Sequence, residues 1–586
     1  MRSFKIGLLL SFLIILSACS SSSSDNQPEP LNLSIIHMND THSHLDALSN
    51  EELYFDGVKT RTDLGGAARM KTAIDVLSED NENTLILHAG DAVQGTLYYT
   101  AFSGEADFVL LNYYGIDAMT LGNHEFDKGP GSVANYIAWA HFPIISANID
   151  ADAEHLLRGK ILPFTLKVLG HNTVAIIGAT TKDTESTSSP GENLKFEDVG
   201  KSVKNTVNLL KSLGLNKIIL LSHIGYEEDI ELAESVSGID VIVGGHSHTL
   251  LGDQAEFAEF GLSVPAGYDY PTVVKNPDGK DVLVVQAWCW GRAIGELNVS
   301  FDANGEITSY SGHPYLLNSD LFKQNYGAGW VVVGPDVQDR IMALILGSEL
   351  LDIFYEDAGA AAILQPYTDQ IAEKKKTVVA RATEDILRGD PADSFNSGPG
   401  PIVADSMIFK TSSQGVSIAI QPRGGVKADF LAGNITMGDV LSVLPYNSLL
   451  TAIEMTGAEI KNALEDGIDY QVVNNPRGPS NCPWYPYVSG LKFDIIENAS
   501  KGSRVTNIQY RSTPGGGYTA FDLGATYRII VTAYLAGGGD GYTTLKNIPA
   551  ARKTDTGFID ADAFSEYLAS LGTVSNPTEI RITVTY

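Results

Sequence analysis

The chain has 586 residues, of which 44% are hydrophobic and 19% are charged. At roughly 100–200 residues per domain, this length accommodates about three or four domains, or two large ones, and the apolar content excludes a disordered or collagen-like protein. The 71 acidic against 40 basic residues give a net charge of −31, which repels polyphosphate backbones and disfavours a nucleic-acid polymer as partner. Three cysteines are too few for a disulfide scaffold.

The first residues have the pattern of an export signal. Arg2 and Lys5 precede an apolar run over 7–16, which is too short to span a bilayer and ends in Leu-Ser-Ala before Cys19. This resembles a bacterial lipoprotein signal, which implies cleavage before Cys19 and a lipid on that residue that anchors the protein in the cell envelope, in the outer membrane or periplasm of a Gram-negative source. An ordinary secretory peptide with a chance cysteine is the alternative. The predicted segments are 1–18 for the signal and 19–30 for a Ser-rich tether.

Short apolar runs in the first half are each followed by polar, Gly-rich residues. This pattern predicts buried strands whose carboxyl ends meet at one edge of an α/β sheet, with helices at 66–77 and 202–213. The predicted strands cover 31–36, 84–87, 217–221, 241–243, 281–286 and 295–301.

A second globular half follows a predicted linking helix over 336–354. We expect a helix at 457–465 and strands at 487–496 and 527–533 in this half. The expected division is 31–335 for the first domain, 336–368 for the linking helix and hinge, and 369–586 for the second domain.

Seven potential metal ligands each come just after an apolar run of the first half. Mixed His, Asp and Asn ligands suit divalent ions such as Zn²⁺ or Mn²⁺, and two ions about 3.5–4 Å apart need a bridging carboxylate, for which Asp91 is the natural choice. A single His after a strand is usually a core or capping residue, but the joint series of motifs favours a two-metal site. The candidates are Asp40 and His42 (DTH), Asp91 (GDAVQGT), Asn123 (GNHEFD), His223 (LSH), and His246 with His248 (GGHSHT).

This series resembles the calcineurin-like metallophosphoesterases, and the order of motifs together with the second half resembles the 5′-nucleotidase family over nearly the whole mature chain. The resemblance implies a four-layer α-β-β-α metallophosphoesterase domain, a linking helix and an α/β substrate-binding domain. It also implies one metal held by Asp40, His42, Asp91 and His248, and another held by Asp91, Asn123, His223 and His246. Family nucleotidases carry Gln or Asn where this chain has His248, so the metal preference stays open.

The family's catalytic His–Asp dyad matches His124 and Asp127 of GNHEFD. A carboxylate holds the imidazole in one tautomer while the histidine stabilises charge on the phosphoryl oxygens, and metal-activated water attacks phosphorus. His124 as a structural neighbour of Asn123 is the alternative. We expect Glu125 to be solvated or to support the ligands.

The second half carries elements that resemble the family's nucleotide-binding residues. Tyr446 and Tyr534 match the two aromatic residues that sandwich the base, where stacking contributes about 1–3 kcal/mol per base. Asp540, within the Gly-rich run after Tyr534, matches the carboxylate that binds the ribose hydroxyls.

The phosphate-side contacts depart from the family pattern. Lys427 replaces a family Arg, keeping the charge but losing bidentate geometry, and Arg423 stands where a Gly is expected. The alternative interpretation is that Arg423 and Lys427 are solvated charges of a surface loop without a role in binding. Ser448 occupies the place of a base-contacting Asn, for which Asn447 is a substitute, and prolines stiffen the expected loop at 396–401. These changes leave the identity of the substrate undecided, but they do not affect the expected phosphoesterase reaction.

The sequence therefore favours an exported, lipid-anchored metallophosphohydrolase that acts on nucleotides, foremost 5′-nucleoside monophosphates. Nucleotide sugars, NAD, and 2′,3′-cyclic or 3′-nucleotides are alternative substrates. A non-catalytic nucleotide-binding protein and a relative of the sulfur-oxidation hydrolases are the rival classes. The oligomeric state stays open. The family resemblance also implies a large domain rotation, with its pivot in or just after the 336–354 helix.

Overall fold

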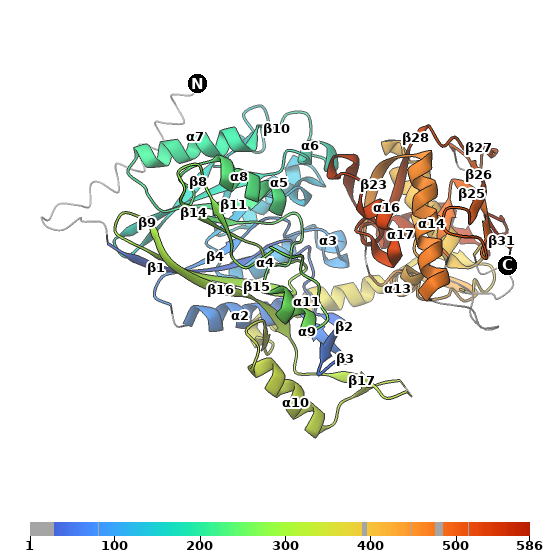
Figure 1. Ribbon diagram of the computed structural model, residues 1–586, viewed down its shortest axis with the longest axis horizontal. Coiled ribbons are helices and arrows are strands. Elements are labelled where there is room, and N and C mark those ends of the chain that lie inside the picture. Colours follow the sequence, from blue (N-terminus) through green and yellow to red (C-terminus); the bar gives the residue numbers. More distant parts are fainter. Residues whose placement is uncertain are drawn as a thin grey trace, which may run out of the picture.

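The computed structural model describes residues 29–79, 81–327, 329–388, 395–446, 448–474, 485–513 and 515–585. The chain forms two bodies side by side, one coloured blue to green and the other orange to red in Figure 1. Helix α11 (Ala358–Lys375) lies between them and leads from the first body into the second. The predicted signal and the tether up to residue 28, with Cys19, lie outside the described residues. Within the described ranges, none of the helices has the length and apolar character needed to cross a membrane.

The first body contains an eleven-stranded sheet in the order β18-β17-β3-β16-β15-β1-β4-β5-β6, with β2 and β19 pairing to β3 and β16. Its central strands β1, β4, β5 and β6 are parallel, so their carboxyl ends point to one edge. The strands are β1 (Leu31–Met38), β2 (Leu48–Phe55), β3 (Val58–Leu64), β4 (Thr84–His88), β5 (Ala118–Thr120), β6 (Ile144–Ile145), β15 (Ala293–Phe301), β16 (Ile307–Asn318), β17 (Lys323–Asn325), β18 (Trp330–Val332) and β19 (Leu351–Ile353).

A second, six-stranded sheet packs face to face on the first. Leu33 and Leu85 of the first sheet share one buried cluster with Leu221 and Val243 of the second, which forms the core between the sheets. Strands β9, β11, β12 and β14 are mutually parallel. The strands are β8 (Phe164–Leu169), β9 (Asn172–Thr180), β11 (Ile218–His223), β12 (Val241–Val243), β13 (Thr272–Lys275) and β14 (Asp281–Val285).

Helices cover the outer faces of both sheets. Phe108, Tyr136 and Leu364 belong to a cluster on the first sheet, while Val207 and Leu232 belong to one on the second. The four-layer α-β-β-α prediction is confirmed. On the first sheet lie α2 (Ala67–Glu79), α3 (Leu97–Phe102), α4 (Glu105–Tyr114), α5 (Pro130–Trp139) and α11, and on the second lie α7 (Val199–Ser212) and α8 (Tyr226–Ser235). Shorter elements are β7 (Ile149–Asp150), α6 (Thr184–Thr187), β10 (Lys195–Phe196) and α9 (Gln254–Glu259).

The helix predicted over 336–354 is shorter than expected and does not connect the two halves. It is α10 (Pro335–Leu346), whose Ile341 and Ile345 pack with Leu53 and Phe55 of the first body. The chain then returns to the first sheet through β19, and α11 makes the connection. Helical periodicity predicted a helix correctly, but it could not show which apolar face its residues would cover. The domain boundaries remain predictions.

The second body is organised around the sheet β24-β21-β28-β23-β29. Alternate residues of β28 face opposite sides, because Ile530 packs in one cluster and Ile529 and Val531 in the other. The strands are β21 (Ile418–Gln421), β23 (Leu449–Thr456), β24 (Tyr487–Ser489), β28 (Thr526–Thr532) and β29 (Lys553–Ile559).

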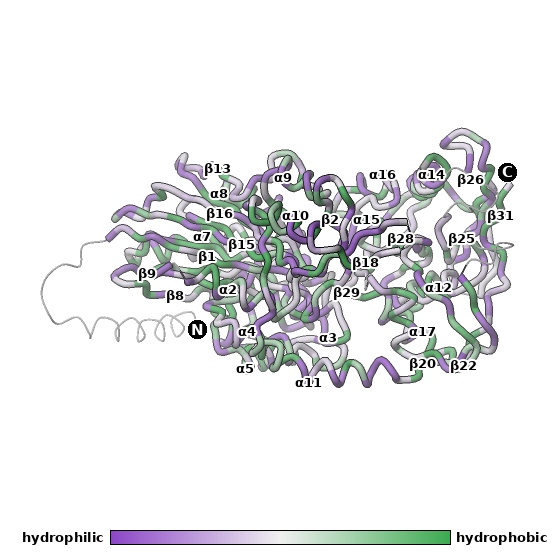
Figure 2. Tube along the Cα trace, turned by 90° about the horizontal axis from the view of Figure 1, so that it is seen from below, coloured by the Kyte–Doolittle hydropathy of each residue, from purple (hydrophilic) through white to green (hydrophobic). Residues whose placement is uncertain are grey.

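Helices and two smaller sheets complete the second body. Figure 2 shows the hydrophobic residues lying mainly along the interior strands of both bodies. Residues of α12, α13 and α17 share one of the two clusters, and residues of α14 share the other. The helices are α12 (Pro399–Thr411), α13 (Met437–Val443), α14 (Gly457–Asn474), α15 (Ala533–Ala536), α16 (Thr543–Lys546) and α17 (Asp560–Leu571). The smaller sheets comprise β20 (Val378–Ala382), β22 (Gly433–Thr436) and β30 (Thr573–Val574), and β25 (Leu491–Ile496), β26 (Val505–Tyr510), β27 (Thr519–Ala520) and β31 (Ile582–Thr585).

Candidate metal centre

The predicted ligands all follow parallel strands of the two stacked sheets. Asp40 and His42 follow β1, Asp91 follows β4 and Asn123 follows β5. His223 is the last residue of β11, while His246 and His248 follow β12. Because the carboxyl ends of these strands meet where the two sheets face one another, residues more than 200 positions apart converge on one site.

Five of the seven predicted ligands have left-handed backbone conformations. The φ angles are 49° for Asp40, 49° for His42, 53° for Asp91, 75° for His246 and 53° for His248. Each such conformation costs a non-glycine residue roughly 1–2 kcal/mol. Strain of this kind persists only where the surrounding structure dictates it and is concentrated at functional sites.

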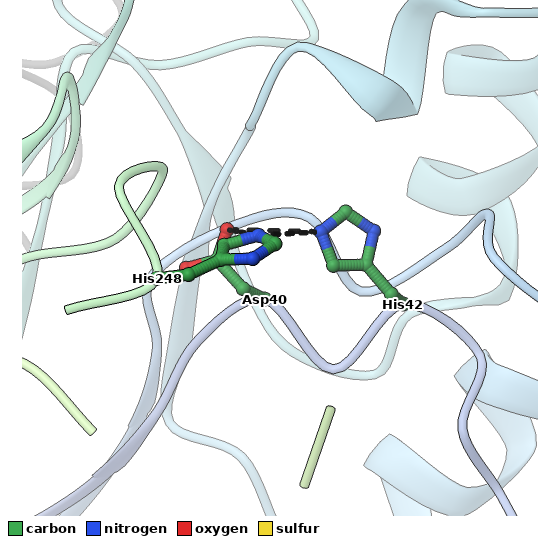
Figure 3. Close-up of side chains that lie close together, drawn as sticks. All are labelled: Asp40, His42 and His248. Carbon is green, nitrogen blue, oxygen red and sulfur yellow. Dashed lines mark hydrogen bonds and ion pairs between the residues drawn. The ribbon is translucent and has the colours of Figure 1, made fainter. Parts of the chain in front are cut away.

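The first ligand group consists of Asp40, His42 and His248, shown in Figure 3. The Nε2 atoms of the two histidines lie 3.0 Å apart, and Nε2 of His248 lies 3.4 Å from Oδ1 of Asp40. Asn39 Nδ2 donates to Oδ2 of Asp40 at 2.6 Å, which leaves Oδ1 directed at the histidines. Three donor atoms therefore converge on one point.

The second ligand group consists of Asp91, His223 and His246. Nε2 of His223 lies 3.0 Å from Oδ2 of Asp91, and its Nδ1 lies 2.7 Å from the backbone oxygen of Ala89, which fixes the ring. Asn123 is 1% exposed, yet neither atom of its amide has a hydrogen-bond partner among the described residues. A buried amide without partners is costly, so Asn123 is suited to offer its oxygen to a metal ion.

Asp91 lies between the two groups. Its Oδ2 is 3.8 Å from Nε2 of His42, and its Oδ1 accepts from the backbone N–H of His124 at 2.9 Å. Burial would raise the pKa of Asp91, but His223 and His124 hold it well below its usual value. An ionised carboxylate between two imidazole clusters has the position that a bridging ligand requires.

The two carboxylates and two of the four imidazoles have the protonation states that metal ligands need. Burial lowers the pKa of His42 to about 3 and that of His246 to about 4, so both imidazoles are neutral. Although burial opposes it, His248 lowers the pKa of Asp40 to about 2. Against the effect of burial, Asp91 raises the pKa of His223 to about 9, and Cys289 and Asp40 raise the pKa of His248 well above its ordinary value, so these two imidazoles would lose a proton on binding a metal. Imidazoles, ionised carboxylates and the Asn123 amide fit divalent ions, and no thiolate is required.

His124 and Asp127 form a hydrogen-bonded pair next to Asp91. Nδ1 of His124 lies 2.8 Å from Oδ2 of Asp127. Burial opposes a charge on the imidazole, but Asp127 and Asp91 raise the pKa of His124 well above its ordinary value. The imidazolium is thus available as a hydrogen-bond donor beside the metal ligands.

Glu125 has a larger part in the site than the sequence indicated. It is fully buried, and its carboxylate accepts backbone N–H groups of Asp91 at 3.1 Å, Ala92 at 2.9 Å and Gly122 at 2.7 Å. It therefore ties the loop after β4 to the loop after β5. The alternative that Glu125 is solvated is wrong, and no local sequence signal separated it from the alternative that Glu125 supports the ligands.

The predicted base-binding residues lie in the second body. The Tyr534 hydroxyl donates to Oδ1 of Asp540 at 3.0 Å, and Nζ of Lys427 lies 5.4 Å from the ring centre of Tyr446. Both rings are about half exposed. Among the described residues, Tyr446, Tyr534 and Asp540 make no hydrogen bond or ion pair with the two ligand groups.

The departures from the family pattern have separate positions in the second body. The guanidinium of Arg423 lies 5.9 Å from the ring centres of Phe395 and Tyr487. Asn447 lies outside the described residues. The loop expected at 396–401 is in part the first turn of α12, because Pro399 begins that helix, where a missing N–H costs nothing.

Comparison with known proteins agrees with this geometry. Residues 33–250 match the calcineurin-like phosphoesterase model, and residues 378–547 match the 5′-nucleotidase C-terminal domain. A probable 5′-nucleotidase of Treponema pallidum is 33% identical, over 93% of each chain. The chain belongs to the 5′-nucleotidase family. The NAD 5′-nucleotidase of Haemophilus influenzae is 31% identical over 95% of this chain and 93% of its own, and the solved structure of NAD nucleotidase from that organism covers 95% of this chain and 100% of its own with a TM-score of 0.79.

Membership in this family establishes the reaction class and the cofactor. The chain is a phosphoesterase of the metallophosphoesterase class, whose members use a dinuclear centre of divalent ions. The two ligand groups at the sheet edges are the candidate halves of this centre. The role of each individual residue remains a prediction.

Proposed function

We propose that the protein is an exported, lipid-anchored 5′-nucleotidase that hydrolyses 5′-nucleoside monophosphates to nucleosides and phosphate. The observation that carries this proposal is the His124–Asp127 pair set beside both ligand groups, at 2.8 Å between Nδ1 and Oδ2. A protein that only bound nucleotides would need neither this pair nor two groups of ligands.

We assign the ligands to two ions that share Asp91. One ion would be held by Asp40, His42 and His248, and the other by Asn123, His223 and His246, each together with Asp91. When bound, two such ions supply an activated water and neutralise charge on the phosphoryl group.

His124 stabilises the charge that develops on the phosphoryl oxygens. Its Nε2 carries a proton, because Asp127 accepts the hydrogen on Nδ1 and keeps the ring charged. A donor fixed in a buried site needs no reorganisation as charge develops, which is why such groups contribute strongly to catalysis.

The second body recognises the nucleoside. Tyr446 and Tyr534 stack on the two faces of the base, and Asp540 accepts the ribose hydroxyls. The Tyr534 hydroxyl occupies Oδ1 of Asp540 but leaves Oδ2 without a hydrogen bond to any described residue. Arg423 and Lys427 supply positive charge on the phosphate side, with Asn447 as a further contact to the base.

Joining the two sets of residues requires a movement between the bodies. We place the pivot at α11, which carries Pro366 in its interior and so lacks one helical hydrogen bond. Cys19, with a lipid attached, would anchor the assembly at the cell envelope, and its replacement by Ser should release the protein from the membrane fraction.

NAD is the second candidate substrate, since the solved relative from Haemophilus influenzae is an NAD nucleotidase. Phosphate release would be measured for the protein from residue 20 onward with 5′-AMP, 3′-AMP, 2′,3′-cyclic AMP, UDP-glucose and NAD. Each would be assayed with EDTA and with Mn²⁺ or Zn²⁺ restored, and a coupled phosphatase would reveal monoester products. Metal-dependent release from 5′-AMP above the others is expected, whereas preferred turnover of NAD would move the assignment to a pyrophosphohydrolase.

A further inference from the structure

A segment of strand β29, in the second body, lies directly over the His124–Asp127 pair of the first. Oδ2 of Asp555, in β29, lies 3.7 Å from Nε2 of His124. The charge of Asp555 also acts on His42 and on His246, one from each ligand group. This carboxylate therefore faces the catalytic histidine although it belongs to the other body.

The backbone of β29 holds Asp555 in this orientation. The backbone N–H of Gly557 donates to Oδ1 of Asp555 at 2.9 Å, which leaves Oδ2 for His124. Gly557 has a φ of +66°, and a Cβ on it would meet both carboxylate oxygens of Asp127 at 3.2 Å. The absence of a side chain at Gly557 thus allows β29 to approach the pair closely.

Two further contacts fasten the same segment to the first body. Nε2 of Gln94, in the loop after Asp91, donates to the backbone oxygen of Gly557 at 2.8 Å. The hydroxyl of Thr100, in α3, donates to Oδ2 of Asp562 at 3.1 Å. The approach of Asp555 to His124 is therefore one of several contacts in an interface between the two bodies. A single side chain that came close by accident would not be accompanied by the other two contacts.

A carboxylate at this place competes with a phosphoryl group. Nε2 of His124 is the donor that the reaction directs at a phosphoryl oxygen, and an anionic oxygen already lies 3.7 Å from it. With two divalent ions bound, the centre would attract anions, so the Asp555 carboxylate and a phosphate group would compete for the same positively charged position.

We propose that Asp555 is an internal anion that occupies the phosphate position of the centre and holds the two bodies in a resting arrangement. This rests on the proposed function, since it takes phosphate monoesters and inorganic phosphate as the ligands that displace Asp555. Binding of either ligand undocks residues 555–557 of β29, and Asp555 thereby sets the apparent affinity of the centre for phosphate.

The test compares Asp555→Asn with the matched control Asp562→Asn in the metal-loaded protein. Asp562 is a carboxylate of the same interface that contacts Thr100 and not His124. Titration calorimetry with inorganic phosphate would measure the dissociation constant. If the docked state is about 90% populated, Asp555→Asn should bind phosphate about tenfold more tightly, because competition for the site has been removed, while Asp562→Asn should change the constant less than threefold.

Hydrogen exchange gives a second readout that does not depend on turnover. Phosphate added to the wild-type protein should speed amide exchange in residues 553–559 and 94–100, and Asp555→Asn should show fast exchange there without phosphate. Equal or weaker phosphate affinity in Asp555→Asn, or exchange that phosphate does not alter, would overturn the proposal, as would a wild-type protein that binds no phosphate. Failure to hydrolyse any nucleotide, with phosphate binding as expected, would overturn the proposed function and leave the role of Asp555 intact.

Discussion

The Nε2 atoms of His42 and His248 lie 3.0 Å apart, although 206 residues separate them in the chain. Two imidazole nitrogens at this distance either share a proton or face a common cation. Oδ1 of Asp40 lies 3.4 Å from His248 and 3.9 Å from His42, so an anionic oxygen completes the group. His248 is far from Asp40 and His42 in the chain, but the three residues converge in the fold. This half of the centre is therefore the most direct place to test metal binding.

Replacing His248 with Ala should remove one of the two ions. The first group then loses one of its three convergent donors, and His42 with Asp40 alone should hold a divalent ion far more weakly. Metal content after dialysis, measured by plasma mass spectrometry, should fall from about two ions per chain to about one. The control is His155→Ala, whose side chain is 80% exposed and belongs to neither ligand group. Two ions retained in His248→Ala would contradict the assignment.

His124→Gln should lower kcat for 5′-AMP by roughly 10²- to 10³-fold while both ions stay bound, because it removes the donor to the phosphoryl oxygens. Asp127→Asn should have a smaller effect with a distinct pH signature. Since Asp127 raises the pKa of His124, its loss should lower that pKa, and activity should be lost at a lower pH on the alkaline side. A kcat profile with an unchanged alkaline limb would argue against this role for Asp127.

Glu125→Gln should loosen the centre without altering the ligands themselves. The amide group would place an N–H₂ donor against backbone N–H groups of Asp91, Ala92 or Gly122, and at least one would lose its acceptor. A buried unsatisfied donor costs about 1–3 kcal/mol. Thermal unfolding of the metal-loaded protein should show a lower midpoint, and metal affinity should fall. The exposed Glu105→Gln serves as the control, and equal melting of the two variants would exclude a supporting role for Glu125.

Tyr446→Ala and Tyr534→Ala should each raise KM for 5′-AMP by about five- to 150-fold, the equivalent of about 1–3 kcal/mol of stacking. Replacement of Tyr446 by Phe should leave KM close to that of the wild type, because the ring that stacks on the base is retained. At Tyr534 the Phe variant also loses the hydroxyl contact to Asp540, so a modest increase is expected there. Hydrolysis of p-nitrophenyl phosphate, which has no base to stack between the rings, is the internal control. A normal KM in both Ala variants would rule out the sandwich.

The ion pair between Glu459 and Arg552 should make part of the stability of the second body depend on pH. Arg552 donates to Oε1 at 3.0 Å and to Oε2 at 2.6 Å, and it lowers the pKa of Glu459 to about 2. A lowered pKa stabilises the fold above the unfolded value of 4.5, and this stabilisation disappears as pH falls towards 2. Both side chains are about one third exposed, so the expected contribution is only about 1 kcal/mol.

Thermal unfolding of Glu459→Gln and of the wild type, measured between pH 7 and pH 3, would check that this stabilisation is lost as the pH falls. The variant should be less stable than the wild type at pH 7 and should approach it near pH 3. Glu231→Gln, at an exposed position of α8, is the matched control and should show no such convergence. A constant difference across the whole range would mean that the charge of Glu459 is not responsible.

The sequence alone determined several buried strands of the first body and the residue types of the centre, and the family resemblance implied its four layers. Period and length of the apolar runs predicted β4 and β12 almost to the residue, since a strand buried on both faces must be apolar throughout. Because the ligand-bearing motifs directly follow such strands, the topology of parallel sheets brings them to one edge. This is why local motifs such as GNHEFD and GGHSHT were sufficient to predict Asn123 and His246 as candidate ligands.

Only the tertiary structure decided which contacts cross between distant parts of the chain. The linking element is α11 and not α10, because apolar periodicity says that a helix has a buried face but not what covers that face. Burial of Glu125 depends on how two loops pack, and the approach of Asp555 to His124 depends on the docking of one body on another. Neither has a local sequence signal, since a lone Glu or Asp in a loop is most often solvated, and the free energy that buries it comes from partners far away in the chain.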